Sequence, residues 1–251
     1  MSKVVIGTFL EHLDELRRRL WVAVAALLAS AAVSFFYADR LLEFALLPAR
    51  NEAVSLYFFT PVDAFVVKIK LALLSGLLVA SPVLLWQLWL FLSPALHAHE
   101  KKAVVPFVAL TSTLFFGGAA FAFFRVLPTA LHFLVGMQTE WMRPLLSVSE
   151  YLSFVSLLVI SFGAAFNLPV FVLILVWTGA VNVQMLNQFQ RQMIVLIFVA
   201  AAVLTPGPDI ASQLLLAVPL VLLYEASVLV ACVVDVLRRK KKEKALKEAV
   251  G

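Results

Sequence analysis

Charged side chains are scarce in this sequence. Asp, Glu, Lys and Arg make up only 14% of its 251 residues, whereas 63% are hydrophobic. A water-soluble domain of this length needs far more polar surface to keep its apolar side chains away from water. The composition therefore excludes an ordinary soluble protein.

Cysteine and the common catalytic motifs are missing as well. Cys232 is the single cysteine, which excludes disulfides within the chain and cysteine-based metal sites. The sequence holds no glycine-rich phosphate loop, no Walker lysine, no His-Glu-x-x-His helix and no Ser-x-x-Lys pair. Apart from His97 and His99, the histidines do not share the spacing of metal ligands. We therefore predict no metal, no cofactor and no enzymatic activity.

Long apolar runs predict an all-α integral membrane protein with six transmembrane helices in one membrane domain. A spanning helix needs about 20 mostly apolar residues, and solid apolar runs favour helices over a β-barrel. The last two runs are short, and the sixth reaches full length only by carrying Glu225 inside it. The expected spans are approximately residues 20–37, 70–92, 103–125, 151–178, 190–205 and 210–235.

Basic residues predict the orientation of these spans. Fourteen of the 20 lysines and arginines fall on the side that holds both chain ends, and seven of them lie between Arg238 and Lys247. Cytoplasmic connections carry such an excess, so both termini, including a basic tail at 236–251, are expected in the cytoplasm. Basic residues beside spans also contact anionic headgroups. The net charge of +5 therefore requires no nucleic-acid partner.

Segments outside the spans are expected to be amphipathic. Phe9, Leu13 and Leu16 recur at helical spacing, which predicts a short cytoplasmic helix over residues 1–19. Residues 38–70 form the longest outer segment, and their apolar spacing and prolines predict short helices lying on the outer surface.

Prolines inside the spans predict bent helices. Pro82, Pro169 and Pro219 each remove a backbone hydrogen bond. Bent, staggered helices favour a concave bundle over a tightly closed one. Four tryptophans near the expected span ends, namely Trp86, Trp89, Trp141 and Trp177, predict a belt at the membrane interface.

A few polar side chains fall inside the expected spans. Glu225 lies in the sixth span, Gln213 near its outer end, and Asn167 in the fourth. A carboxylate at such depth costs a few kcal/mol, so we expect Glu225 to face protein or water and to serve a function. The alternative is that it reaches the inner surface or pairs with a helix. For Asn167 and Gln213, hydrogen bonding between helices is an equally good explanation.

Two carboxylates are expected at the cytoplasmic surface, Glu15 before the first span and Glu100 after the second. Such a pair suits a cationic guest, above all guanidinium groups, which pair with carboxylates through two hydrogen bonds. Each is alternatively a solvated residue paired with its neighbour Arg18 or Lys102. The residues alone leave both interpretations open.

Several segments, in order over nearly the whole chain, resemble one family. The stretch His12-Leu13-Asp14-Glu15-Leu16-Arg17 resembles the amino-terminal motif of the TatC family of twin-arginine translocase proteins. Further matches are Ser81–Phe91 with Pro94-Ala95-Leu96 and Glu100-Lys101, then Tyr151–Phe154, and last Thr205–Asp209 with Ser212-Gln213 and Leu223-Tyr224-Glu225.

The resemblance implies a six-span, glove-shaped receptor for the twin-arginine signal peptides of folded proteins. It implies signal-peptide binding by six residues, namely Glu15, Glu100, Arg17, Leu16, His12 and Lys101. It places Asp209 and Tyr151 on the outer side and makes Gln213 and Glu225 the polar positions of the sixth span. Asn167 departs from the pattern, because the family usually has a glutamate there.

The resemblance also implies partners and a location. Single-span proteins TatA and TatB would dock along the fifth and sixth spans, and further copies of the chain would join them in the lipid bilayer. Export would draw on the proton-motive force through these partners, in a bacterial-type cytoplasmic (inner) membrane. The competing hypotheses are a secondary transporter that binds a solute or ion through Glu225 and, less favoured, an intramembrane enzyme.

Overall fold

The computed structural model describes residues 2–52, 54–92, 104–136, 145–177, 181, 183–204 and 210–250. The chain divides into two compact units. Unit 1 holds Met1–Phe116 and Val135–Leu157, and unit 2 holds Gly117–Leu134 and Leu158–Gly251.

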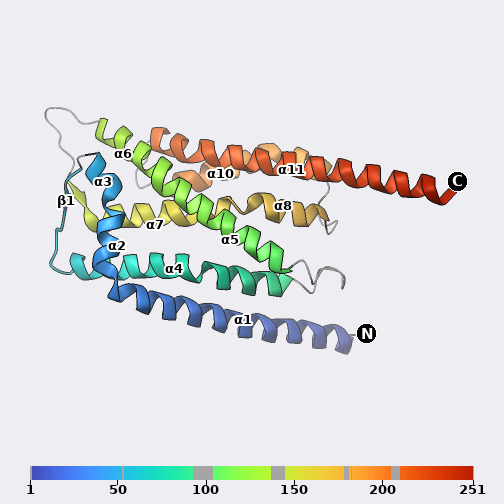
Figure 1. Cartoon of the computed structure of the whole chain (residues 1–251), viewed down its shortest axis with the longest axis horizontal. Coiled ribbons are helices and arrows are strands. Elements are labelled where there is room, and N and C mark those ends of the chain that lie inside the picture. The colour runs from blue at the N-terminus through green and yellow to red at the C-terminus, as the bar shows by residue number, and fades with distance from the viewer. Residues whose placement is uncertain are drawn as a thin grey trace. The chain divides into compact units, whose positions relative to one another are not determined.

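Nearly all of the described residues are helical, which confirms the all-α prediction (Figure 1). The helices are α1 (Ser2–Phe36), α2 (Ala38–Ala45), α3 (Leu47–Asn51), α4 (Asp63–Leu92), α5 (Val104–Phe121), the π-helix η3 (Ala122–Val126), α6 (Leu127–Gly136), α7 (Val148–Ala165), α8 (Leu168–Trp177), α9 (Val183–Gln188), α10 (Gln190–Leu204) and α11 (Ile210–Val250). Two short strands, β1 (Leu56–Tyr57) and β2 (Leu146–Ser147), pair in parallel. The short helices expected within residues 38–70 are present as α2 and α3, and their place on the outer surface remains a prediction.

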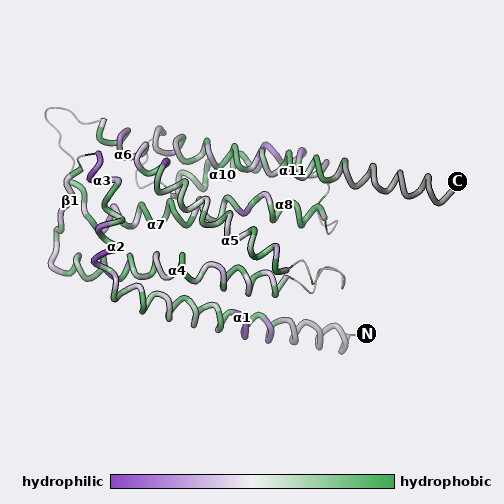
Figure 2. The backbone as a smooth tube through the Cα atoms, viewed as in Figure 1, coloured by the Kyte–Doolittle hydropathy of each residue, from purple (hydrophilic) through white to green (hydrophobic). Residues whose placement is uncertain are grey.

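Five helical stretches of the described chain are long and apolar enough to cross a membrane. They are Leu13–Phe36, Asp63–Phe91, Val105–Gly136, Val148–Val176 and Leu216–Val234. They correspond to predicted spans one to four and six, and α11 runs through Glu225 without a break. The fifth predicted span is a shorter apolar helix, Gln190–Ala202. Figure 2 shows the apolar stretches along α1 and α4, with hydrophilic residues gathered in α2 and α3. The count of six and the concave, glove-like arrangement remain predictions.

The first span does not start as a separate helix. We expected residues 1–19 to form a short helix of their own, but α1 is one helix from Ser2 to Phe36. No proline or glycine falls between Thr8 and Phe36 to end it. The motif at residues 12–17 therefore continues directly into the apolar stretch of the same helix.

Pro169 breaks its helix, whereas Pro82 and Pro219 lie inside continuous helices. α7 ends at Ala165, and α8 begins at Leu168. The residue before a proline disfavours helical backbone. At the break the Asn167 amide donates to Ala164 instead of completing the helical ladder.

A π-turn precedes a fourth proline, Pro128, and lengthens the third span. The Leu127 amide reaches back to the Ala122 carbonyl, one residue further than in an α-helix. Proline has no amide hydrogen, and its ring clashes with the carbonyl four residues earlier. A wider turn is one way in which a helix accommodates this. The helical stretch therefore continues to Gly136, beyond the predicted end at 125.

α1 and α4 pack closely as an antiparallel pair in unit 1. The Ser30 hydroxyl donates to the Gly76 carbonyl at 2.8 Å. A Cβ added at Gly76 would lie 2.6 Å from the Ala31 backbone, so the two helices touch backbone to backbone. Small residues are the usual means of such an approach in membranes.

The far end of this pair is tied to α2 and α7. Lys68 pairs with Asp39 at 2.8 Å. Lys70 donates to the Ser149 carbonyl at 3.2 Å and to the Ser149 and Ser153 hydroxyls, each at 2.8 Å. The buried Tyr151 hydroxyl donates to the Ala45 carbonyl at 2.7 Å. These contacts hold the 38–57 segment against the spans.

Unit 2 is built around α11. Val172 and Val176 of α8 pack with Ala231 of α11, and Leu186 of α9 lies against them. The end of α5 joins this unit through Phe121, whose ring centroid lies 6.0 Å from that of Phe162 and 5.7 Å from that of Phe166.

Gly76→Ala is expected to destabilise unit 1, because the new Cβ would meet the Ala31 backbone at 2.6 Å. Overpacking of this kind costs about 1 to 3 kcal/mol, so the thermal midpoint of the detergent-solubilised chain should fall by several degrees. Gly117→Ala is the matched control, since no other part of the described chain comes within 4 Å of a Cβ built there. Equal midpoints for the two variants would contradict the close helix contact.

Tyr151→Phe should also lower the thermal midpoint, because the Ala45 carbonyl loses its bond to a buried hydroxyl. Removing one partner of a buried hydrogen bond costs about 1 to 3 kcal/mol. Tyr37→Phe removes a hydroxyl from a side chain that is 57% exposed and should leave the midpoint unchanged. A midpoint at the wild-type value for Tyr151→Phe would show that this bond does not hold the outer segment.

Candidate functional site

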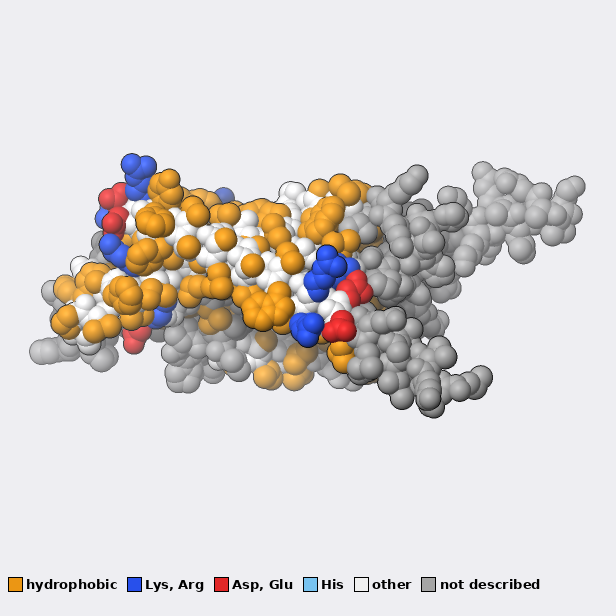
Figure 3. Space-filling view, turned by 90° about the horizontal axis from the view of Figure 1, so that it is seen from below, with side chains coloured by type: hydrophobic (Ala, Val, Ile, Leu, Met, Phe, Trp, Pro, Cys, Tyr) orange, Lys and Arg blue, Asp and Glu red, His pale blue; other side chains and the backbone are white. Residues whose placement is uncertain are grey.

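The charged residues at 14–19 of α1 lie directly before its apolar stretch, which begins at Leu20. Figure 3 shows acidic and basic side chains gathered where the apolar surface of α1 ends. This band holds three of the six predicted signal-peptide residues, namely Glu15, Leu16 and Arg17.

Glu15 forms an ion pair within its own helix. The Arg19 Nε donates to Glu15 Oε1 at 3.1 Å, and Arg19 Nη2 contacts the same oxygen. The Glu15 side chain is 34% exposed and that of Arg19 is 19% exposed. The sequence offers Arg18 as an alternative partner of Glu15, and the structure shows an ion pair with Arg19, four residues along the same helix face.

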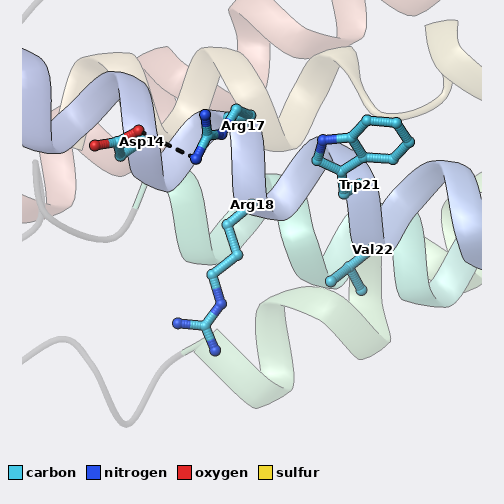
Figure 4. Close-up of a pocket in the computed structure, with 5 residues that line it drawn as sticks. All are labelled: Asp14, Arg17, Arg18, Trp21 and Val22. Atoms are coloured by element: carbon cyan, nitrogen blue, oxygen red, sulfur yellow. Dashed lines mark ion pairs between the residues drawn. The ribbon is translucent and has the colours of Figure 1, made fainter.

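Arg17 belongs to a different pair. Its Nη2 lies 3.6 Å from the Asp14 carboxylate, and both side chains are 75% exposed. Together with Arg18, Trp21 and Val22 these two residues line a hollow on the surface of α1 (Figure 4). The structure thus places Glu15 and Arg17 near each other in the chain but in separate ion pairs, one half-buried and one exposed.

The packing of α1 on α4 fixes what lies level with Glu15. Lys68 of α4 pairs with Asp39 of α2, the helix that follows α1. Eight residues further along α4, Gly76 meets Ala31 of α1, which lies eight residues before Asp39 in the chain. Because the two helices run antiparallel, sixteen residues forward from Gly76 along α4 correspond to sixteen residues back from Ala31 along α1. Leu92, the last residue of α4, is therefore level with Glu15. The segment 93–103, which carries Glu100 and Lys101, starts at that point. Those two residues, Asp209 and the His12 side chain lie outside the described residues.

A buried contact beside this segment was not predicted. Trp89 is only 2% exposed, and its indole Nε1 donates to the Thr111 hydroxyl at 3.1 Å. Its ring stacks on Phe107 with centroids 5.5 Å apart. The expectation that Trp89 belongs to an interfacial belt is therefore wrong, whereas Trp86 is 37% exposed, as a belt residue should be. A tryptophan near a span end does not reveal which face of the helix it occupies.

The polar residues of unit 2 make hydrogen bonds between helices or within one. Gln190 Nε2 of α10 donates to Glu225 Oε1 of α11 at 2.6 Å. Gln213 Nε2 of α11 donates to the Phe198 carbonyl of α10 at 2.9 Å, as the helix-to-helix interpretation expects. Asn167, in the break between α7 and α8, donates from Nδ2 to the Gly163 carbonyl of α7 at 2.9 Å. Its buried Oδ1 has no hydrogen-bond partner among the described residues.

Comparison with known proteins identifies the family. The family model for the Sec-independent protein translocase protein (TatC) matches residues 11–219. The TatC protein of Aquifex aeolicus is 39% identical over 237 residues, covering 93% of this chain and 97% of that protein. The TatC protein of Carboxydothermus hydrogenoformans is 36% identical over 224 residues, covering 89% and 92%.

The fold agrees with that similarity. A crystal structure of the twin-arginine translocase receptor TatC superposes with a TM-score of 0.81 at 39% identity, covering 88% of this chain and 98% of that one. The family model, the sequence similarity over most of the chain and the backbone fold therefore agree. The chain belongs to the TatC family of Sec-independent protein translocase proteins.

Proposed function

We propose that this chain is the receptor subunit that binds twin-arginine signal peptides of folded proteins at the cytoplasmic face of a bacterial inner membrane. The observation that supports a binding site is the register of α1 on α4, which brings Glu15 level with the end of α4, where the segment carrying Glu100 begins. Two carboxylates near one level would form a site for two adjacent guanidinium groups.

Glu15 has the chemistry that this role needs. An ionised carboxylate only accepts hydrogen bonds, and a guanidinium presents several donors in a planar fork. The Arg19 contact shows that the carboxylate already accepts a guanidinium in the folded chain. Glu15 is also less exposed than Asp14, 34% against 75%, and pairs screened from water are stronger than surface pairs. A guest arginine would share or replace the Arg19 contact.

The proposal includes six spans with both termini in the cytoplasm. α10, which would be the fifth span, has 15 residues. At about 1.5 Å per residue it covers roughly 22 Å, less than the roughly 30 Å of a bilayer core. A short span is accommodated by local thinning of the bilayer or by association with other helices.

α10 and α11 are the proposed docking site for the single-span partners TatA and TatB, with further copies of the chain in the same complex. Apolar residues on both helices are exposed, among them Val195 and Val199 of α10 and Leu222 of α11. The bonds from Gln213 to Phe198 and from Gln190 to Glu225 hold the two helices together.

Glu225 thus has a partner within the protein, and family membership replaces the transporter hypothesis based on it.

Glu15→Ala and Glu100→Ala should each weaken binding of a fluorescent twin-arginine signal peptide to the full chain in nanodiscs. A hydrogen bond to a charged group contributes about 1.5 to 3 kcal/mol, so we expect the dissociation constant to rise about tenfold or more. Glu15→Lys should weaken binding further, because it repels the guest. Asp14→Ala, which removes the neighbouring exposed carboxylate, is the control and should change the constant by less than about twofold. Wild-type affinity in Glu15→Lys would refute the assignment.

A photo-crosslinker in place of Leu16, whose side chain is 42% exposed next to Glu15, should give adducts with a twin-arginine peptide. The adducts should vanish when both peptide arginines become lysines, because lysine cannot form the two-point contact. The same crosslinker in place of Phe36, 86% exposed at the other end of α1, should give none. Equal labelling by the lysine peptide would exclude the guanidinium mechanism.

A further inference from the structure

The hollow lined by Asp14, Arg17, Arg18, Trp21 and Val22 shares Arg17 with the proposed peptide site but does not include Glu15. Its lining holds two guanidinium groups and one carboxylate, so these side chains together carry one net positive charge. The Asp14–Arg17 pair is loose, at 3.6 Å with both side chains 75% exposed. Arg18 extends away from that pair (Figure 4), and it forms no ion pair within the described part of the chain. The hollow therefore offers guanidinium donors to an anion.

The hollow also lies at the depth of lipid headgroups. Its polar part belongs to the charged band of α1, and its apolar part begins the membrane-spanning stretch (Figure 3). Trp21 is 69% exposed and Val22 is 43% exposed. In the register that pairs Ala31 with Gly76, Trp21 lies ten residues back along α1 and Trp86 ten residues forward along α4, so the two tryptophans share a level. Exposed tryptophans at one level mark the membrane interface.

We propose that this hollow binds the phosphate of an anionic phospholipid. Arg17 and Arg18 would donate to the phosphate oxygens, which match the planar guanidinium fork. The Trp21 indole would lie at the glycerol level, and an acyl chain would run from there toward Leu28, which lies about two turns further on the same helix face and is 59% exposed. A headgroup with one net negative charge complements the single net positive charge of the hollow. Free inorganic phosphate offers the same oxygens but has no part that would contact Trp21 and Val22.

The lipid site does not depend on the signal-peptide proposal. Glu15 and Arg19 are each at most 34% exposed, whereas Asp14 and Arg17 project into solvent. Arg18 belongs to no predicted peptide-binding set, so its substitution tests the lipid alone.

The test uses the full chain in phosphatidylcholine nanodiscs that contain a small fraction of brominated phosphatidylglycerol or brominated phosphatidylcholine. Bromine quenches nearby tryptophan, and the Trp21 signal is the difference between the wild-type chain and Trp21→Phe. Brominated phosphatidylglycerol should quench Trp21 several times more than brominated phosphatidylcholine does. Arg18→Gln should reduce this preference about fivefold, and Arg17→Gln with Arg18→Gln should abolish it.

Arg40→Gln is the matched control, because it removes an exposed arginine from α2 in the same unit and should keep the full preference. Arg18→Lys should retain part of the preference for brominated phosphatidylglycerol, because the positive charge stays. It should not retain all of it, because the planar guanidinium group is lost. Equal quenching by the two brominated lipids, or an unchanged preference in Arg18→Gln, would overturn the proposal. Loss of the preference on adding millimolar inorganic phosphate at constant ionic strength would overturn it in favour of a free-phosphate site.

Discussion

The contact between Gly76 and Ala31 fixes the geometry on which the Glu15 end of the α1–α4 pair depends. Without a side chain on Gly76, α1 and α4 approach until a Cβ there would lie 2.6 Å from the Ala31 backbone, and Ser30 bonds to the Gly76 carbonyl across the gap. Two helices held this tightly cannot slide, so their register is set along their whole length. That register determines which residues share a level along the pair, namely Glu15 with Leu92, the last residue of α4, and Trp21 with Trp86.

The spans were predictable because their length is imposed by the bilayer. An apolar run either covers the hydrocarbon core or it does not, and the sequence alone decides this for Leu13–Phe36 or Leu216–Val234. Interruptions were harder to predict. Pro82 and Pro169 look alike in the sequence, yet one lies in an unbroken helix and the other follows a break. Which outcome occurs depends on what bonds the freed carbonyls, and that is a property of the packed structure.

The candidate site was predictable by residue but not by pairing. Asp14 and Glu15 each have an arginine at helical spacing, three residues on for Asp14 and four residues on for Glu15, so several ion pairs fit the sequence equally well. The folded chain decides between them, because it leaves Glu15 and Arg19 less exposed and keeps Asp14 and Arg17 in solvent. Trp89 shows the same limit. Its position near a span end was evident, but its burial against Thr111 and Phe107 was not.

Asn167 shows how a departure from the family pattern is compensated locally. The break before Pro169 leaves the Gly163 carbonyl without its usual helical donor, because the Asn167 backbone amide turns to Ala164. The Asn167 side chain fills that gap by donating Nδ2 to Gly163 at 2.9 Å. A glutamate donates only when protonated, whereas an amide always does. The amide at this position therefore satisfies the broken ladder without burying a charge, although it leaves a buried oxygen without a partner among the described residues.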